Sequence, residues 1–274
     1  MLHRAHDYQH LVTRWRAVAR ESGLKLRRLA RDDGFDLFYL QTQDATPGLY
    51  VSAGIHGDEP AAPEALIQWA EHHTTRLSSW PLLIFPCLNP WGLRNNIRTD
   101  SRGRDVNRLF HGKSHPVVAA VRRVVKDRRF AVSLSMHEDY DAQGTYLYEV
   151  QRGTRHLGEK LLGAARRILP PDPRPRIDGR KAEKGLIRRR IAPRTFEKIG
   201  YPEAIWLHLH HSDYTFTFET PSEADLGLRV SAHIAVIEQC LAIAIATRAL
   251  RAIPGSAPLP PLRTAGARRS RSRP

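Results

Sequence analysis

Apolar residues recur every three to four positions in several stretches of the chain, which is the spacing of one face of an α-helix. The pattern predicts helices over Tyr8–Glu21, Ala61–His73, Val117–Lys126 and Ser222–Arg251. Pro60 directly precedes the second of these, and proline fits the first turn of a helix because its missing N–H leaves no hydrogen bond unmade there.

Shorter apolar runs alternate with these helices and predict strands. The runs are Phe35–Gln41, Gly48–Gly54, Leu82–Leu88, Phe130–Met136, Thr145–Val150, Ala204–Leu209 and Tyr214–Glu219. Leu82–Leu88 and Phe130–Met136 are nearly continuous in apolar residues, as expected for strands buried on both faces of a sheet. We therefore predict an α/β fold of three layers, with a mixed, largely parallel central sheet between helices.

Two segments show neither the helical spacing of apolar residues nor the short apolar runs of strands. Asn89–Gly112 is polar and longer than the loops of compact domains usually are without a functional reason. Pro170–Arg194 is rich in Pro, Arg and Gly, which predicts an irregular excursion. The composition beyond Pro254 predicts a flexible basic tail, so we expect a single domain over residues 1–253 and a tail over residues 254–274.

The chain is strongly basic, with 43 Lys and Arg against 28 Asp and Glu and a net charge of +15. Such a field attracts anionic substrates or nucleic acid. Much of the excess lies in residues 166–194 and in the tail, where no aromatic residues interleave with the charges as they do in many nucleic-acid-binding segments. We interpret both as solvated basic segments, and nucleic-acid binding through them is the less favoured alternative.

Two cysteines, Cys87 and Cys240, exclude a disulfide framework and a Cys-rich structural zinc site. The first 20 residues lack the apolar run of a signal peptide, and no later stretch has the roughly 18 consecutive apolar residues of a membrane span. We therefore expect a cytoplasmic protein that does not cross a membrane.

The densest chemical signal is Gly54-Ile55-His56-Gly57-Asp58-Glu59-Pro60, a tight loop between a predicted strand and a predicted helix. A catalytic zinc ion takes three nitrogen or oxygen ligands from the protein and keeps a position for water. His137 follows a predicted strand and would emerge at its carboxyl end, where open α/β sheets bind ligands. Singly, these residues have ordinary structural explanations, but together His56, Glu59 and His137 are candidate ligands of one zinc ion per chain.

Five blocks in this order resemble the zinc carboxypeptidase family, and specifically its compact branch of murein-peptide amidases and succinylglutamate desuccinylase or aspartoacylase-like deacylases. The resemblance covers roughly residues 48 to 250 and implies a zinc-exopeptidase-like form of the predicted fold. The blocks are Gly54-Ile55-His56-Gly57-Asp58-Glu59, Leu88-Asn89-Pro90-Trp91-Gly92, Arg98 through Asp105-Val106-Asn107-Arg108-Leu109-Phe110, Met136-His137-Glu138-Asp139, and Phe216-Thr217-Phe218-Glu219-Thr220-Pro221.

The resemblance also implies roles for the matched residues. His56, Glu59 and His137 match the family's zinc ligands. Asn107 and Arg108 match the pair that binds a substrate carboxylate, a task for which the arginine fork is well shaped.

The remaining catalytic roles fall on two residues. Arg98 matches the arginine that polarises the scissile carbonyl, although Arg94, Arg102 and Arg104 lie in the same loop. Glu219 matches the glutamate that activates water and passes the proton to the leaving amine. No tyrosine fits a motif well enough to be assigned as the family's active-site tyrosine; the candidates are Tyr146, Tyr148, Tyr201 and Tyr214.

The implied function is zinc-dependent hydrolysis of an amide bond next to a free carboxylate. The leading substrate is a short or peptidoglycan-derived peptide, and the alternative is an N-acyl amino acid cleaved by a desuccinylase or aspartoacylase-like deacylase. A rival from another class is a basic nucleic-acid-binding protein with a degenerate metal site. We expect His208, His210 and His211 to form a His-rich strand and turn near the rim of the site rather than a second metal site.

Overall fold

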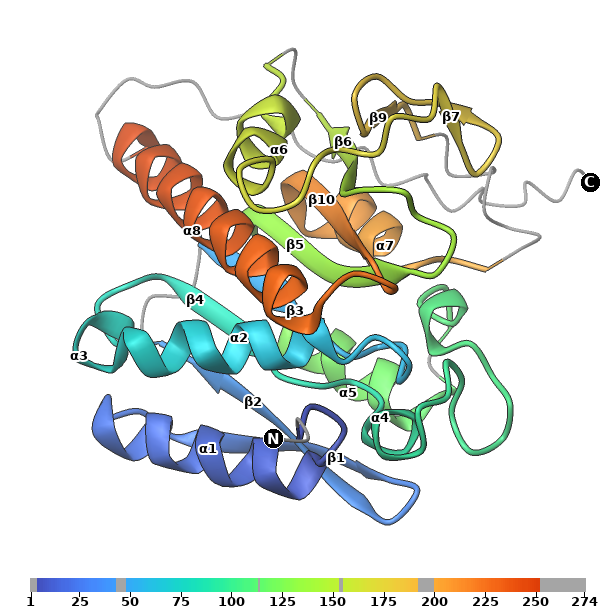
Figure 1. The fold of residues 1–274 in the computed structure, drawn as a ribbon. Helices are drawn as coiled ribbons and strands as arrows, with labels where there is room; N and C mark the ends of the chain where they lie inside the picture. Colours follow the sequence, from blue (N-terminus) through green and yellow to red (C-terminus); the bar gives the residue numbers. More distant parts are fainter. Residues whose placement is uncertain (1–3, 43–47, 113, 153–154, 192–199, 252–274) are drawn as a thin grey trace, which may run out of the picture.

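Helices and strands alternate along the chain (Figure 1). The computed structural model describes residues 4–42, 48–112, 114–152, 155–191 and 200–251. The helices are α1 (Tyr8–Glu21), α2 (Ala61–His72), α3 (Thr74–Leu77), α4 (Pro90–Asn95), α5 (Pro116–Val124), α6 (Gly158–Ala165), α7 (Glu203–His210) and α8 (Leu226–Arg251), with a 3-10 turn over Val106–Arg108. The strands are β1 (Leu26–Asp32), β2 (Phe35–Gln41), β3 (Leu49–Ser52), β4 (Leu82–Phe85), β5 (Phe130–Asp139), β6 (Tyr146–Gln151), β7 (Arg176–Ile177), β8 (Arg180–Lys181), β9 (Leu186–Arg189) and β10 (Ser212–Pro221).

Eight of these strands form one sheet in the order β1-β2-β4-β3-β5-β10-β6-β9. The central strands β4, β3, β5 and β10 pair in parallel, and so do β6 and β9. β1 with β2, β2 with β4, and β10 with β6 pair antiparallel. The predicted mixed, largely parallel sheet is confirmed.

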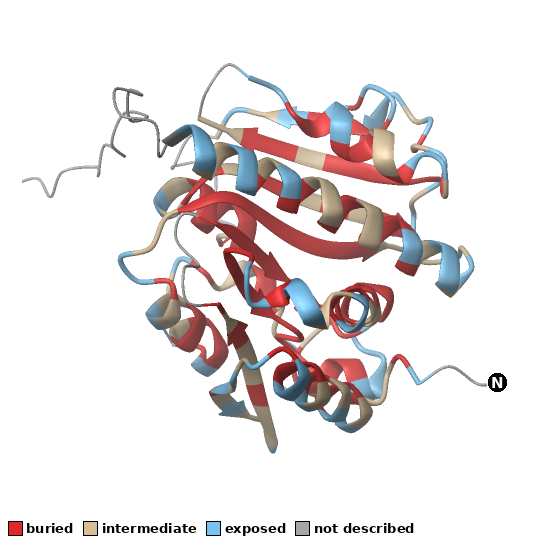
Figure 2. Cartoon of the chain, turned by 90° about the vertical axis from the view of Figure 1, so that its left-hand side faces the viewer, coloured by how far each residue is buried: buried red, intermediate tan, exposed pale blue. Residues whose placement is uncertain are grey.

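Helices cover both faces of the sheet, as the three-layer prediction requires. The core on one face packs against α1, α2, α6 and α8, and the core on the other face packs against α5 and α7. The central strands and the inward faces of helices are buried, while the outer faces of several helices are exposed (Figure 2).

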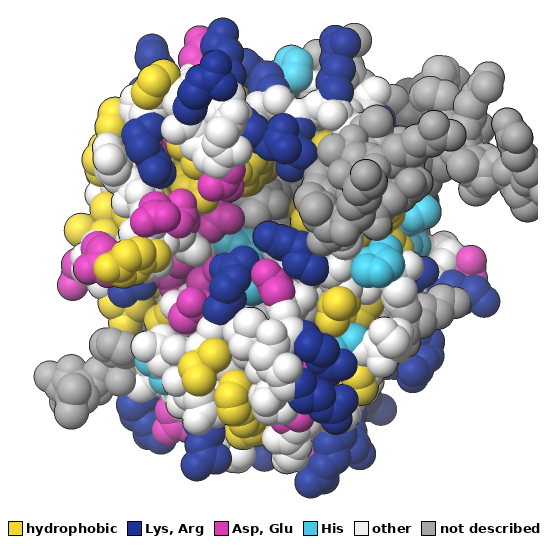
Figure 3. Space-filling model, turned by 90° about the vertical axis from the view of Figure 1, so that its right-hand side faces the viewer, with side chains coloured by type: hydrophobic (Ala, Val, Ile, Leu, Met, Phe, Trp, Pro, Cys, Tyr) yellow, Lys and Arg dark blue, Asp and Glu magenta, His cyan; other side chains and the backbone are white. Residues whose placement is uncertain are grey.

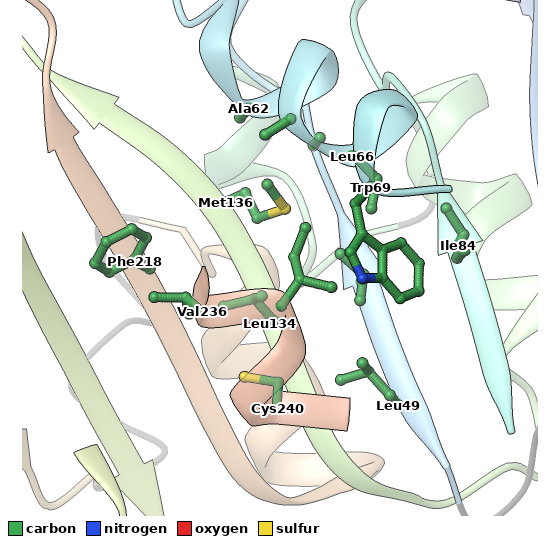
Figure 4. Packing of buried hydrophobic residues seen from close by; sticks show 14 of the residues in the cluster. Leu49, Ala62, Leu66, Trp69, Ile84, Leu134, Met136, Phe218, Val236 and Cys240 are labelled. Carbon is green, nitrogen blue, oxygen red and sulfur yellow. The ribbon is translucent and has the colours of Figure 1, made fainter. Parts of the chain in front are cut away.

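The central strand β5 separates two kinds of side chain. Leu134 and Met136 point into the same core as Trp69 of α2 and Val236 of α8 (Figure 4). Because side chains alternate along a strand, residues 133, 135 and 137 face the other side, where α7 lies. These three are Ser133, Ser135 and His137, so a buried polar row runs beneath α7.

The structure corrects several local predictions. The expected strand Ala204–Leu209 is wrong, because these residues form most of α7. A short apolar run does not by itself distinguish a buried strand from a buried helix. The strands β7, β8 and β9 lie within Pro170–Arg194, which was expected to be irregular, and α4 lies within the expected loop Asn89–Gly112. The expected tail, residues 254–274, lies outside the described residues.

Helix α8 also departs from expectation. Its segment Leu226–Leu250 is long and apolar enough to cross a membrane, judged by length and composition only. No such segment was predicted, and Arg229, Glu238 and Arg248 do interrupt the apolar run. Nearly half of the apolar window is buried inside the molecule. The core helix of a globular protein gives the same signal, and α8 packs in this way against the sheet, α2 and α6.

Candidate metal and active site

Three strands deliver the three predicted metal ligands and Glu219 to the carboxyl edge of the parallel part of the sheet. β3 leads into the loop that carries His56 and Glu59, and β5 carries His137. In β10, Glu219 pairs directly with His137 in the parallel register. Acidic, basic and histidine side chains meet there in a hollow on one face of the molecule (Figure 3).

The loop after β3 lies tightly against α4. A Cβ atom on Gly57 would lie only 1.9 Å from the backbone carbonyl carbon of Gly92, so this close approach requires glycine. The side chain of Asn89 caps α4 by accepting a hydrogen bond from the Gly92 N–H at 2.9 Å, and it donates to the backbone oxygens of Arg98 and Thr99. The long polar loop is therefore anchored beside the site.

The three predicted ligands converge. Nδ1 of His56 lies 2.6 Å from one oxygen of Glu59, and Nδ1 of His137 lies 2.8 Å from the other. All three side chains are buried, and one potential ligand atom from each lies within 4.8 Å of the other two. Among the described residues, this is the group of His, Cys, Asp and Glu side chains placed to share a metal ion.

The outward-facing nitrogens of the two imidazoles are also held. His56 Nε2 lies 3.2 Å from Oδ1 of Asp105, and His137 Nε2 lies 3.5 Å from the side-chain amide nitrogen of Asn107. The Asp105 carboxylate is an acceptor of the kind that fixes the ring orientation and tautomer of a metal-binding histidine. The Asn107 amide nitrogen is a donor and makes only a long contact with the Nε2 edge of His137. Two imidazoles with one carboxylate are a known ligand set of catalytic zinc, so these residues fit that ion.

The charges of the cluster are strongly coupled. Burial opposes protonation of His56, but the carboxylates of Glu59 and Asp105 raise its pKa to about 9. Burial raises the pKa of Glu59, but the adjacent His56 and His137 outweigh it and hold that pKa far below its usual range. Opposite charges at hydrogen-bonding distance produce shifts of this sign.

Glu219 lies in different surroundings. Burial raises its pKa well above the usual range, the negative charges of Glu59 and Asp139 add to the rise, and His137 opposes it. Glu219 lines the same pocket as the three predicted ligands. A carboxyl group with a raised pKa is suited to accept a proton and then to release it.

The structure selects Arg98 from the four arginines of its loop. Its guanidinium lies 3.5 Å from Glu59 and 3.3 Å from Asp105, at the edge of the pocket. Arg104 instead pairs with Asp100 at 2.6 Å. Among the described residues, neither Arg94 nor Arg102 lines this pocket.

Asn107 and Arg108, the predicted carboxylate-binding pair, also line the pocket. The Asn107 side-chain oxygen accepts a hydrogen bond from the backbone N–H of Glu203 at 2.8 Å, which turns its amide nitrogen toward His137. The guanidinium of Arg108 donates to the backbone oxygen of Asn107 at 3.0 Å and lies 3.9 Å from Asp105. All seven predicted site residues therefore lie around one cavity of about 470 Å³.

Two of the four candidate tyrosines reach this cavity. Tyr146 donates its hydroxyl hydrogen to Asp139 at 2.9 Å, and Tyr148 donates to Asp178 at 2.5 Å. Burial raises the pKa of both phenols above the ordinary value, so both stay protonated at neutral pH. Tyr201 and Tyr214 are not among the described residues that line the cavity.

A larger cavity, of about 770 Å³, lies at the carboxyl ends of α5 and α7. His210 and His211 line it together with Trp206 and a run of basic side chains. None of His208, His210 and His211 lines the pocket of the predicted metal ligands, and His208 and His210 lie on α7, so the predicted His-rich strand and turn at the rim of that pocket is wrong.

The fold and the site together define an α/β protein in which a buried His-Glu-His group could hold a metal ion, and comparisons with known proteins agree with this class. Residues 45–142 match the family described as the succinylglutamate desuccinylase/aspartoacylase catalytic domain. The comparison with curated proteins found no match.

Solved structures share the fold over most of the chain. A protein proposed to be a metallopeptidase, from Shewanella amazonensis SB2B, superposes with a TM-score of 0.77 at 20% identity over 88% of this chain and 94% of its own. A metallo-carboxypeptidase from Burkholderia cenocepacia gives a TM-score of 0.62 at 13% identity over 86% of this chain and 68% of its own. A metallo-carboxypeptidase from Pseudomonas aeruginosa, in complex with (2-guanidinoethylmercapto)succinic acid, gives 0.55 at 20% identity over 82% and 68%.

The solved structures thus confirm the fold that the resemblance implies, and residues 45–142 match in sequence its desuccinylase and aspartoacylase branch. Fold and family segment together indicate an enzyme of the hydrolase type.

Two residues of the site were missed as functional candidates. Asp105 stands inside a matched block but had no assigned role, because its contacts to His56 and Arg98 become apparent only in three dimensions. Glu203 was missed because it directly precedes the residues that were wrongly predicted to form a strand, and in the structure it begins α7.

Proposed function

We propose that the chain is a zinc-dependent hydrolase that cleaves an amide bond next to a free carboxylate, with short or peptidoglycan-derived peptides as its substrates. The observation that carries the proposal is the convergence of His56, Glu59 and His137 beside Glu219. A zinc ion held by these ligands supplies Lewis-acid chemistry, which acidifies water and polarises a carbonyl group.

The chain's own residues divide the remaining work. Asn107 and Arg108, here called the substrate clamp, present an amide N–H group and a guanidinium to the carboxylate of the substrate, and this contact orients the scissile bond. Arg98 supplies a fixed positive charge near the carbonyl oxygen, where negative charge develops. Glu219 takes the proton of the attacking water on a side-chain oxygen and delivers it to the leaving amine.

A second substrate class is supported by the family match. The matched family is named for a succinylglutamate desuccinylase and an aspartoacylase. An N-acyl amino acid carries a free carboxylate next to its amide bond, so it meets the same requirement of the substrate clamp. We therefore propose an N-acyl amino acid deacylase as the alternative.

A substrate screen separates these proposals. Zinc-loaded protein is incubated with murein-derived peptides, simple dipeptides and N-acyl amino acids, and released amine and bound metal are measured in parallel. We expect hydrolysis in one substrate class, its loss on chelation and its recovery with zinc. Salt-sensitive nucleic-acid binding that survives chelation, with no hydrolysis in any class, would instead support the rival nucleic-acid-binding protein.

A further inference from the structure

Glu203 is a fully buried acidic residue that the mechanism above does not use. It is the first residue of α7, and its buried side chain faces hydroxyl groups of β3 and β5. One carboxyl oxygen accepts a hydrogen bond from the Tyr50 hydroxyl at 2.6 Å. The other accepts from the hydroxyls of Ser52 at 2.5 Å and Ser135 at 2.9 Å.

These hydrogen bonds join the elements that build the site. Tyr50 and Ser52 belong to β3, which leads to His56 and Glu59, and Ser135 lies two residues before His137 on β5. A buried carboxyl group without partners would be costly, and each hydroxyl is aimed at it. The amino end of α7 is therefore fastened to both strands that carry the predicted metal ligands.

The backbone of Glu203 continues this connection into the substrate clamp. Its N–H donates to the Asn107 side-chain oxygen at 2.8 Å. With the oxygen occupied, the amide nitrogen of Asn107 is left to face His137 and the pocket. Without that donor, the Asn107 amide could rotate by half a turn and present its oxygen to the substrate carboxylate.

We propose that Glu203 is a positioning residue: its carboxyl group fixes the start of α7 on β3 and β5, and its N–H sets the orientation of Asn107 in the substrate clamp. The inference rests on the proposed function, because it assumes that Asn107 and Arg108 bind a carboxylate. It differs from a general role in stability by acting on carboxylate recognition and not on metal binding.

Two small thiols test this without any substrate. With zinc-loaded full-length protein, calorimetry compares 3-mercaptopropanoate, which offers a thiolate and a carboxylate, with 1-propanethiol, which lacks the carboxylate. We expect Glu203→Gln to weaken 3-mercaptopropanoate binding about tenfold, the loss of one charge-assisted hydrogen bond, while the affinities for 1-propanethiol and zinc stay unchanged.

The matched control is Glu149→Gln. Glu149 is also buried and accepts hydrogen bonds from Leu157 and Gly158 at the start of α6. Unlike that of Glu203, its carboxyl group has no hydrogen bond to β3, β5 or the substrate clamp among the described residues. We expect this variant to lower the melting temperature and leave both thiol affinities unchanged. If Glu203→Gln does not fold, Ser52→Ala removes one donor and keeps the carboxyl group, and the same selective loss is expected.

The outcomes separate the two proposals. A Glu203 variant that binds 3-mercaptopropanoate as tightly as the wild type overturns the positioning role and leaves the proposed function standing. A wild-type protein that binds zinc but shows no preference for 3-mercaptopropanoate over 1-propanethiol overturns the substrate clamp, and with it both proposals. An equal loss of affinity for both thiols in the variant shows a general structural effect and also overturns the positioning role.

Discussion

Two carboxyl groups in one pocket are driven in opposite directions by their neighbours. Glu59 lies between two imidazoles, which hold its pKa far below the usual range and keep it available as an anionic ligand. Glu219 is buried beside other carboxylates, which raises its pKa. Pairs of titratable groups whose pKa values are pushed apart are typical of acid-base sites, and the division here supports a ligand role for Glu59 and a proton-transfer role for Glu219.

The role of Glu219 can be tested by an isosteric change. Glu219→Gln keeps the size of the side chain and removes the proton-accepting oxygen, so we expect kcat to fall by on the order of a thousandfold. KM and zinc content, measured by steady-state kinetics and metal analysis, should stay near the wild-type values. Glu183→Gln, at an exposed position outside the pocket, serves as the control. Turnover within tenfold of wild type would remove Glu219 from the mechanism.

Arg108 offers a test of carboxylate recognition. Arg108→Lys keeps the positive charge and loses the planar fork, so we expect kcat/KM for a substrate with a free carboxylate to fall about tenfold or more. The same substrate with its carboxylate amidated should be cleaved slowly by both proteins and should distinguish them little. Equal losses for the two substrates would place Arg108 outside carboxylate binding.

The residues of the metal group could be predicted because their signal is local or lies at the end of a strongly apolar strand. His56 and Glu59 stand three residues apart in one turn, and His137 and Glu219 lie on buried strands that pair in register. The roles of Asp105 and Glu203 could not be predicted, because their partners lie far away in the sequence and no motif links them. Their roles depend on how the long polar loop and α7 pack against the sheet.

At the scale of whole elements, predictions succeeded where periodicity was strong and failed where it was short or masked by charge. α1 begins and ends where predicted, and Asp7 caps it by accepting a hydrogen bond from the His10 N–H at 2.9 Å. β1, with the sequence Leu-Arg-Arg-Leu-Ala-Arg-Asp, was not predicted because its arginines conceal the strand pattern. Such charges are common on the edge strands of sheets, and β1 is the first strand of the order.

Helix α7, whose residues were predicted to form a strand, carries a histidine that makes the stability of the fold depend on pH. Burial of His208, aided by repulsion from Arg152, lowers its pKa to about 4, while the unfolded chain retains a value near 6.5. Below pH 6.5 the unfolded state therefore binds a proton that the folded state does not. The stability contribution is present above pH 6.5 and is lost as pH falls toward 4, by on the order of 3 kcal/mol over that range.

A non-titrating variant isolates this contribution. In His208→Gln, the free energy of unfolding measured by urea titration should decline less between pH 6.5 and 4 than in the wild type. Both proteins are measured with a chelator present, so that titration of the metal ligands contributes equally to each. Parallel pH profiles for the two proteins would show that His208 takes up a proton as readily in the folded state as in the unfolded state, and would contradict the lowered pKa.

At the scale of the whole molecule, the fold brings together ligands that the chain keeps far apart. His56 and Glu59 follow strand β3, and His137 lies on β5, the parallel strand beside it. Their carboxyl-terminal strand ends meet only when the parallel strands have paired, so the group does not exist in an unfolded chain. A metal ion that binds this group binds the folded state alone, and its binding free energy adds to the stability of the whole sheet.

Zinc should therefore raise the melting temperature. At a free zinc concentration one hundred times the dissociation constant, the stabilisation is about 2.7 kcal/mol, which corresponds to a shift of roughly 5–10 °C for a chain of this size. Differential scanning calorimetry at fixed pH measures it, and magnesium, which prefers oxygen ligands in octahedral geometry, serves as the control ion. Glu59→Gln removes the carboxylate that joins the two imidazoles, so this variant should lose most of the zinc-induced shift. If the variant kept the full shift, the ion would be bound elsewhere, and the site built on His56, Glu59 and His137 would have to be abandoned.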